Sequence, residues 1–261
     1  MVPTRRLYEE TPTLRAFDAA VVQCRPDPAA EGYWETALNA TAFYPEGGGQ
    51  PCDLGLLGEQ PVLAVRMDGE GVVWHRTAQP LPEGAALHGE IDWDRRFDHM
   101  QQHTGEHILS GILHSLYGAE NVGFHIGSPA VRVDVSLPLT AEQLARAEEQ
   151  ANDTVQADKP VHCWVPPHEE LANLPYRSKK ELEGDVRLVD AGGADLCACC
   201  GTHVATTGQV GLIKILSAQN YKGGVRLAVA CGKRACRAVS DLWADSQAAG
   251  ALLSVPAGES A

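Results

Sequence analysis

Two short motifs in this chain carry residue types that bind metal ions. His103 and His107 are four positions apart, and Cys199 and His203 repeat that spacing about ninety residues later. Residues at i and i+4 lie on one face of a helix, so both imidazoles of the first pair can reach a single ion. Together the pairs offer three imidazoles and one thiolate, which is a common zinc ligand set. The spacing therefore predicts one Zn²⁺ site per chain.

The distribution of the eight cysteines favours metal binding over disulfide cross-linking. Cys197, Cys199 and Cys200 lie within four positions, and such crowding suits a metal or catalytic site better than a covalent staple. Spacing alone leaves open which of Cys197, Cys199 and Cys200 is the thiolate ligand. The role of the ion is open as well, because four protein ligands are typical of a structural site whereas catalytic zinc keeps one position for water or substrate.

The first motif also fits a second hypothesis. His103-Thr104-Gly105-Glu106-His107 matches H-x-x-E-H, the inverted zinc-peptidase motif. In that alternative Glu106 is the general base that activates a zinc-bound water, and Glu181 or Glu183 supplies a third ligand. The peptidase hypothesis leaves the later Cys/His pair without a role. Glu106 could act as a base in a different hydrolysis too.

A glycine-rich loop is the second candidate for chemistry. Gly47, Gly48 and Gly49 are followed directly by Gln50. Successive glycines disfavour helix and strand, and they allow main-chain N–H groups to point at an oxyanion or phosphate. Gln50 adds an amide that can both donate and accept a hydrogen bond. We expect this loop to contact a substrate.

The elements that must hold these residues change in character near residue 92. Residues 1–92 contain short apolar stretches separated by Pro, Gly and Asp, which is typical of a β-rich domain. From Asp92 to Tyr117 apolar residues recur at intervals of three and four, so the histidine pair is predicted to lie on an amphipathic helix. The β-rich ranges include 19–22, 62–65 and 71–75.

The rest of the chain mixes strands and helices. Thr140 and Gln143 have the spacing of a capping box that opens a helix. Strands are predicted at 131–136, 186–189, 210–216 and 225–231. Without a regular βαβ rhythm this pattern predicts an α+β domain over residues 93–236. Residues 237–261 are predicted to form a partial helical C-terminal extension.

Composition limits the partners. The net charge of −13 argues against a protein that coats nucleic acid by charge alone, although stacking and base-edge contacts can still hold a single RNA end. No apolar run approaches the roughly 20 residues that span a bilayer, and the N-terminus lacks the apolar core of a signal peptide. We expect a cytoplasmic protein with neither a membrane nor DNA as partner.

Taken together, the motifs resemble the AlaX-type free-standing alanyl-tRNA editing proteins and the editing domain of alanyl-tRNA synthetase. The resemblance spans about residues 5 to 235, and the order of the motifs makes it specific. The matching segments are Phe43-Tyr44-Pro45-Glu46-Gly47-Gly48-Gly49-Gln50, Asp92-Trp93, Arg95-Arg96, His103 with His107, Cys199-x-Gly201-Thr202-His203-Val204, Thr207-Gly208, Lys214 and Gly223-Gly224-Val225-Arg226.

The resemblance implies a fold and a reaction. The fold is a barrel-like N-terminal domain followed by the α+β editing domain common to threonyl- and alanyl-tRNA synthetases. The reaction is zinc-dependent hydrolysis of serine or glycine from mischarged alanine tRNA, so the expected partner is the aminoacylated acceptor end of tRNA. A non-catalytic tRNA-binding module with structural zinc is the remaining alternative.

The resemblance also assigns residues by position. Zinc is assigned to His103, His107, Cys199 and His203. Substrate binding is assigned to Gly47, Gly48, Gly49, Gln50, Thr202 and Arg226, and catalytic roles to Gln50 and Glu106.

Overall fold

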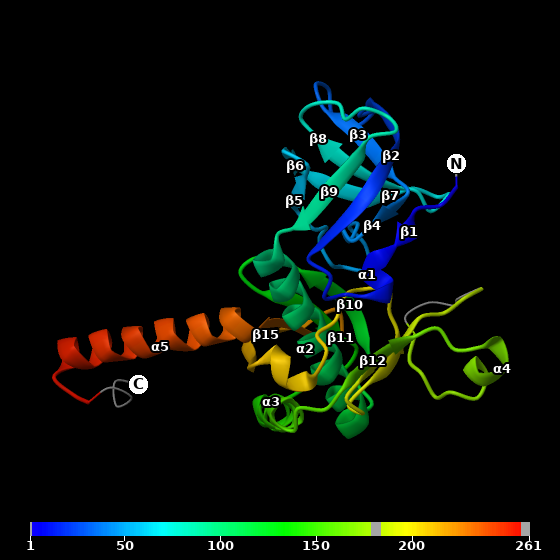
Figure 1. Cartoon of the computed structure of the whole chain (residues 1–261). Coiled ribbons are helices and arrows are strands. Elements are labelled where there is room, and N and C mark those ends of the chain that lie inside the picture. Colours follow the sequence, from blue (N-terminus) through cyan, green and yellow to red (C-terminus); the bar gives the residue numbers. More distant parts are fainter. Residues whose placement is uncertain (1, 179–183, 257–261) are drawn as a thin grey trace. The chain divides into compact units, whose positions relative to one another are not determined.

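The computed structural model describes residues 2–178 and 184–256 (Figure 1). The chain forms two compact units and crosses between them several times. Unit 1 contains Met1–His103, Cys163–Val189 and Cys197–Val204, and unit 2 contains Thr104–His162, Asp190–Leu196 and Ala205–Ala261. The predicted domain ranges 1–92, 93–236 and 237–261 remain a prediction. No helix among the described residues is long and apolar enough to cross a membrane.

Unit 1 contains a seven-stranded sheet that nearly closes on itself, which confirms the predicted barrel-like domain. Edge strand β6 contacts β8, the neighbour of the opposite edge strand β7. In spatial order the strands are β6 (Gln60–Val62), β5 (Gly55–Leu57), β9 (Ala86–Ile91), β2 (Ala16–Pro26), β3 (Trp34–Leu38), β8 (Val73–Thr77) and β7 (Ala64–Met67).

The barrel interior is filled by alternating side chains. Along β2, Phe17, Ala19 and Val21 are buried because successive strand residues face opposite sides of a sheet. Phe17 meets Phe43 edge to face, with 5.8 Å between ring centroids. The strand predicted at 62–65 is wrong in one respect, because it is interrupted at the half-exposed Leu63, which separates β6 from β7.

Several short elements lie in unit 1 and in the segments where the chain passes from one unit to the other. Strands β1 (Arg5–Arg6) and β4 (Ala40–Thr41) form a parallel pair around helix α1 (Leu7–Glu10). A three-stranded sheet has the order β12 (Val161–Trp164), β13 (Leu188–Ala191) and β14 (Leu196–Ala198). Helix α4 is the single turn His168–Leu171. Strand β13 lies two residues later than the strand predicted at 186–189.

Helix α2 (Trp93–Tyr117) confirms the helix predicted from Asp92 to Tyr117, but its expected amphipathic character is wrong for the middle of the helix. It begins after Asp92, whose Oδ1 accepts a hydrogen bond from the N–H of Arg95 at 3.1 Å, as an N-cap carboxylate does. It ends at Gly118, whose φ of 67° is a left-handed conformation that glycine adopts readily. Residues 99–113 are all buried, so the middle of the helix is covered on every side and not along one apolar face alone.

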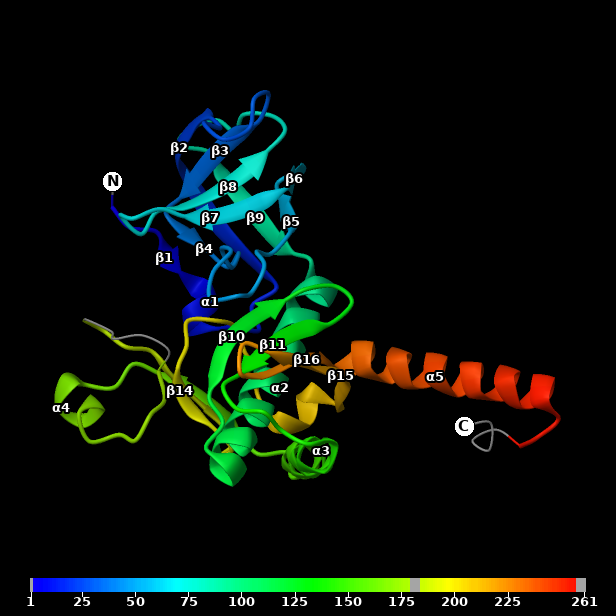
Figure 2. The same cartoon turned by 180° about the vertical axis from the view of Figure 1, so that it is seen from behind.

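Unit 2 is built on an antiparallel sheet with the order β10 (Asn121–Ile126), β11 (Val131–Val135), β16 (Gly224–Cys231) and β15 (Ile213–Tyr221). Helix α3 (Ala141–Gln156) begins with the predicted capping box between Thr140 and Gln143. The predicted strand at 210–216 is wrong at its start, because a 3₁₀ turn, η1 (Thr207–Val210), precedes β15. Helix α5 (Gly232–Leu253) follows β16 directly and projects away from this sheet in both views (Figures 1 and 2).

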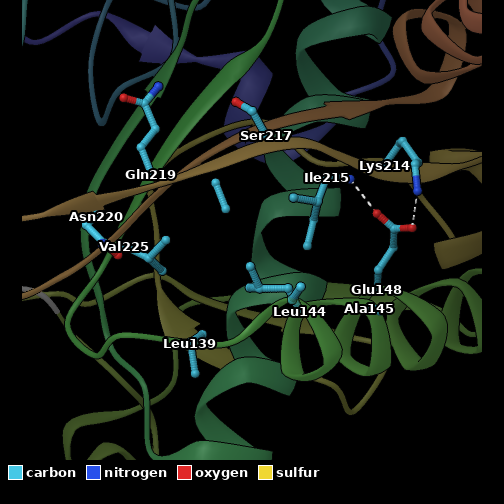
Figure 3. Close-up of a pocket in the computed structure, with 12 residues that line it drawn as sticks. Leu139, Leu144, Ala145, Glu148, Lys214, Ile215, Ser217, Gln219, Asn220 and Val225 are labelled. Atoms are coloured by element: carbon cyan, nitrogen blue, oxygen red, sulfur yellow. Dashed lines mark hydrogen bonds and ion pairs between the residues drawn. The ribbon is translucent and has the colours of Figure 1, made fainter. Parts of the chain in front are cut away.

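A groove of about 410 Å³ runs between α3 and β15 in unit 2 (Figure 3). Its floor is apolar, with Leu144 and Ile215 pointing into it. Glu148 closes one end by accepting hydrogen bonds from Lys214 Nζ at 2.5 Å and from the N–H of Ile215 at 2.6 Å. None of the predicted site residues lines this groove.

Candidate metal centre

Both histidines of the first motif lie on helix α2 and are buried, with 2% of His103 and 4% of His107 exposed. The helix continues without interruption from unit 1 into unit 2. The separation of the two imidazoles is therefore set by one helical turn, which places residues i and i+4 on the same face.

The second motif approaches His103 within unit 1. Cys199 Sγ lies 3.4 Å from His103 Nε2, and the ring centroids of His103 and His203 are 4.6 Å apart. With His107, these residues form a group whose ligand atoms all lie within 4.8 Å of one another and which could hold a metal ion. All four predicted ligands are thus brought together.

Gly201 makes this approach possible. A Cβ atom at this position would lie 2.1 Å from His103 Cε1 and 2.3 Å from His103 Nδ1. No larger residue could keep the turn and the imidazole where they are, because such distances are far shorter than a van der Waals contact. The glycine in the second motif is required by packing against the first.

Gln50 connects the glycine loop to both motifs. Its Oε1 accepts hydrogen bonds from His103 Nδ1 at 2.8 Å and from the N–H of Thr202 at 3.2 Å, while its Nε2 donates to Thr202 Oγ1 at 2.9 Å. Since the amide oxygen only accepts, the proton of His103 lies on Nδ1. His103 Nε2 is then the unprotonated nitrogen that faces Cys199.

Asp195 does for His107 what Gln50 does for His103. Within unit 2, His107 Nδ1 lies 3.1 Å from Asp195 Oδ2, and both side chains are buried. A carboxylate on one imidazole nitrogen orients the ring, holds the other nitrogen as the ligand and raises its basicity. Sequence reasoning missed Asp195, because no spacing rule connects it to a residue 88 positions earlier.

The donor chemistry fits zinc. Three imidazoles and one thiolate are the usual ligands of Zn²⁺, and the outer nitrogens of two of the imidazoles already have fixed partners. The structure favours Cys199 as the thiolate, because Cys200 is exposed and outside the ligand group. The Cys199 Sγ also accepts a hydrogen bond from the N–H of Gly201 at 3.3 Å.

The glycine loop is a tight two-residue turn. The N–H of Gly47 donates to the Gln50 carbonyl at 3.1 Å and the N–H of Gln50 donates back at 2.9 Å. Gly48 and Gly49 at the tip have positive φ values of 59° and 83°, as a type I′ turn requires. The Tyr44 hydroxyl donates to the Gly47 carbonyl at 3.0 Å, and burial raises the pKa of this phenol so that it stays protonated.

The other predicted residues lie in different surroundings. Glu106 is buried, and its carboxylate accepts hydrogen bonds from Ser110 Oγ at 2.5 Å and from Asn121 Nδ2. Arg226, in unit 2, forms a two-point ion pair with Asp134 and stacks on Tyr221 with its guanidinium carbon 3.6 Å from the ring centroid. The alternative peptidase ligands at 181 and 183 lie outside the described residues.

Arg187 is a further neighbour of the ligands that sequence reasoning missed. Its Nη1 donates to the carbonyl oxygens of Cys199 at 2.8 Å and Gly201 at 3.0 Å. Arg187 follows a charged stretch that contains no recognisable motif. Nothing in the local sequence therefore distinguishes this arginine from one on the surface.

The chain is similar in sequence to known proteins over most of its length. Residues 186–227 match the family described as "Threonyl and Alanyl tRNA synthetase second additional domain", a segment that includes Cys199 and His203. The chain is 38% identical over 208 residues to "Alanyl-tRNA editing protein Aarsd1-B" of Xenopus laevis. It is also 38% identical over 257 residues to an "Alanine--tRNA ligase" of Pyrobaculum neutrophilum, and 36% identical over 249 residues to that of Pyrococcus furiosus.

The coverage of these relatives is unequal. The alignment with the Xenopus protein uses 78% of this chain and 50% of the relative. The two ligase alignments use 92% and 90% of this chain but only 28% and 26% of the ligases. The chain therefore spans about half the length of the editing proteins and about a quarter of the ligases that it matches.

Proposed function

We propose that this chain, a relative of the alanyl-tRNA editing proteins, is a zinc-dependent hydrolase that removes serine or glycine from mischarged alanine tRNA. The proposal is supported by that similarity and by the match to the second additional domain of threonyl and alanyl tRNA synthetases. The observation that carries the proposal is the convergence of Cys199, His203 and Gln50 on His103. These contacts join three segments that are distant in sequence at one place.

The bond to be broken is the ester between the amino acid and the terminal ribose. A zinc ion held by His103, His107, Cys199 and His203 would polarise the ester carbonyl or lower the pKa of a bound water. The chain's own part is to orient the imidazoles through Gln50 and Asp195. The tip of the glycine turn offers the amides of Gly48 and Gly49 as donors to a developing oxyanion.

Selection between amino acids needs a polar partner for the extra group of serine. A pocket built for alanine rejects serine only weakly, because a hydroxyl adds little volume. A site that hydrogen-bonds the serine hydroxyl reverses this preference, because bound alanine would leave a buried polar group without a partner. Thr202 Oγ1 and the second amide proton of Gln50 are the proposed partners, since Gln50 Nε2 uses only one proton on Thr202.

A deacylation assay tests the proposal. Purified protein is incubated with alanine tRNA charged with serine, with glycine or with alanine, and the release of each amino acid is followed. We expect serine or glycine to be released well above the buffer rate and alanine to be largely spared. Cys199→Ala should fall to the buffer rate, while Cys236→Ala, which changes an exposed cysteine outside the ligand group, should behave as wild type. Equal rates for wild type and Cys199→Ala would refute the proposal.

Glu106 is one of the two residues with a predicted catalytic role and could act as a base in this hydrolysis, which can be tested separately. Glu106→Gln keeps the size of the side chain, and its amide oxygen can still accept the hydrogen bonds from Ser110 and Asn121. It removes the basic carboxylate. If Glu106 moves a proton in the reaction, we expect a loss of about a hundredfold in kcat at unchanged zinc content. A wild-type kcat would restrict Glu106 to holding Ser110 and Asn121. Cleavage of unstructured peptides, abolished by the same substitution, would favour the inverted peptidase instead.

A further inference from the structure

Arg187 is a buried arginine that is bonded to the main chain of the turn carrying Cys199. Only 8% of the residue is exposed. One nitrogen, Nη1, donates to two carbonyl oxygens of this turn, Cys199 O at 2.8 Å and Gly201 O at 3.0 Å. The main chain adds a third bond, because the N–H of Cys199 donates to the Arg187 carbonyl at 3.0 Å. Arg187 thus holds both ends of a three-residue turn.

This turn is the part of the ligand group with the least support of its own. It contains no helix or strand hydrogen bonds, since β14 ends at Ala198. Its geometry nevertheless has to be accurate, because Gly201 packs against the His103 ring and its N–H donates to Cys199 Sγ. The two N–H bonds of Nη1 have fixed directions in the planar guanidinium, so bonding both carbonyls fixes the direction in which the Cys199 side chain leaves the backbone.

The charge of Arg187 is also unusual. Within the described part of the chain, Nη2 is buried without a hydrogen-bond partner, and Nη1 bonds only carbonyl oxygens. A buried cation that lacks a counter-charge costs several kcal/mol. Cysteine binds a metal as the thiolate, so metal binding would create a negative charge on the residue whose carbonyl Arg187 already holds.

We propose that Arg187 is a positioning residue of the metal centre, which orients the Cys199 turn through its carbonyls. The inference rests on the metal centre of the proposed function and is independent of the substrate. Arg187 touches neither substrate nor metal in this role. It acts through Cys199, in the way that Gln50 and Asp195 act through the histidines.

Cobalt binding provides the test, because Co²⁺ replaces Zn²⁺ and a cysteine thiolate gives it a charge-transfer band in the near ultraviolet. Wild type, Arg187→Lys and Arg187→Met are titrated with Co²⁺ and then competed with Zn²⁺. Arg187→Lys keeps the charge but replaces the planar Nη1, whose N–H bonds have fixed directions, by a rotating ammonium group on a flexible stem. Arg234→Met is the matched control, because Arg234 also bonds a main-chain carbonyl, Gly127 O at 2.5 Å, but in unit 2.

We expect Arg187→Met to bind both metals about 10- to 100-fold more weakly and to have a shifted or weaker thiolate band. Arg187→Lys should be intermediate, and Arg234→Met should match wild type. Circular dichroism of the metal-free proteins identifies variants that do not fold, and if Arg187→Met is one of them, Arg187→Lys carries the comparison. Wild-type affinity and band in every folded Arg187 variant would overturn the inference.

The same titration separates this inference from the proposed function. A wild-type protein that binds Co²⁺ through a thiolate but hydrolyses no aminoacyl-tRNA refutes the proposed reaction and leaves the role of Arg187 standing. A wild-type protein that shows no thiolate band overturns both the metal centre and the role of Arg187.

Discussion

The hydrogen bond from His103 Nδ1 to Gln50 Oε1 determines which nitrogen of this imidazole faces Cys199. Spacing predicts that His103 and Cys199 could share an ion, but it says nothing about the tautomer. That depends on Gln50, 53 positions earlier, for which the sequence predicts substrate-binding and catalytic roles but no contact with a metal ligand. Gln50 therefore has a second task that no motif indicates, namely to join the loop to a ligand.

Gly201 offers a test at the residue scale. Gly201→Ala adds a Cβ only 2.1 Å from His103 Cε1, so either the turn or the imidazole must move. We expect a loss of about a hundredfold in kcat/KM for deacylation, since a displacement of about 1 Å can have this effect, together with weaker zinc retention on dialysis. Gly69→Ala is the control, because a Cβ there meets nothing within 4 Å. Full zinc retention and activity in Gly201→Ala would contradict the packing argument.

His75 provides a second test, which concerns pH. It is fully buried on β8, with Nδ1 3.0 Å from Thr36 O and Nε2 2.8 Å from Thr41 Oγ1. Burial lowers its pKa to about 4, whereas an unfolded chain protonates this histidine near its ordinary pKa of about 6.5. The unfolded state therefore binds more protons between these values, and stability is lost as the pH falls from about 6.5 to about 4.

Urea unfolding at a series of pH values measures this effect. Between pH 6.5 and 5 we expect His75 to account for a loss of about 2 kcal/mol in the free energy of unfolding. His75→Gln has no titrating ring, so its stability should change less over the same range, whatever its stability at neutral pH. Parallel pH profiles for the two proteins would show that His75 is not the group responsible.

At the scale of elements, helix α2 and the glycine loop are held together by a buried ion pair. Arg96, two helical turns before His103, bonds both carboxylate oxygens of Asp53 and donates to the carbonyls of Pro12 and Ala42. Asp53 in turn accepts from the N–H of Tyr44 at 2.6 Å. This network lies in unit 1 and connects the helix that bears His103 with the loop that bears Gln50.

Arg96→Met tests that connection. Removing one partner leaves Asp53 as a buried charge without compensation, so we expect a loss of about 3–5 kcal/mol in the free energy of unfolding. Arg95→Met is the control, because Arg95 is partly exposed and donates to a single carbonyl, Cys52 O at 3.0 Å. The free energy of unfolding of Arg95→Met should fall by only about 1 kcal/mol. Similar losses for the two substitutions, measured by urea unfolding, would contradict the proposed importance of the ion pair.

The elements that the sequence predicts best are those with local causes. The presence of helix α2, its end at Gly118 and the capping box of α3 are confirmed because each depends on residues within a few positions. The predictions at 62–65, 186–189 and 210–216 are displaced or interrupted, because apolar residues near strand ends do not indicate where the chain turns. The partners of Arg96 and His107 were not predicted, since both lie far away in the sequence.

At the scale of the whole molecule, the proposed metal ligands come from segments about a hundred residues apart. A metal bound only by the folded chain should stabilise it by mass action, by about 2.7 kcal/mol when the free metal is a hundredfold above its dissociation constant. We expect thermal unfolding to occur several degrees lower after chelation and to recover when Zn²⁺ is restored. A melting temperature that is insensitive to chelator and to added Zn²⁺ would argue against a bound metal.

The net charge of −13 affects how the molecule meets its proposed partner. Repulsion from the phosphate backbone has to be offset by local contacts, so binding of tRNA should be modest and sensitive to salt. Composition alone is enough to predict this modest, salt-sensitive binding. It does not predict where the local contacts lie, because that depends on which charged residues, such as Arg226 with Asp134, are already paired in the fold.

X-ray absorption at the zinc edge is the measurement that addresses the shared metal centre most directly. We expect one sulfur ligand at about 2.3 Å and three nitrogen ligands at about 2.0–2.1 Å. Cys199→Ser should lose the sulfur shell, and Cys200→Ser should keep it. A wild-type spectrum with no sulfur or with two sulfurs, or a sulfur shell that survives in Cys199→Ser, would contradict the metal centre described here.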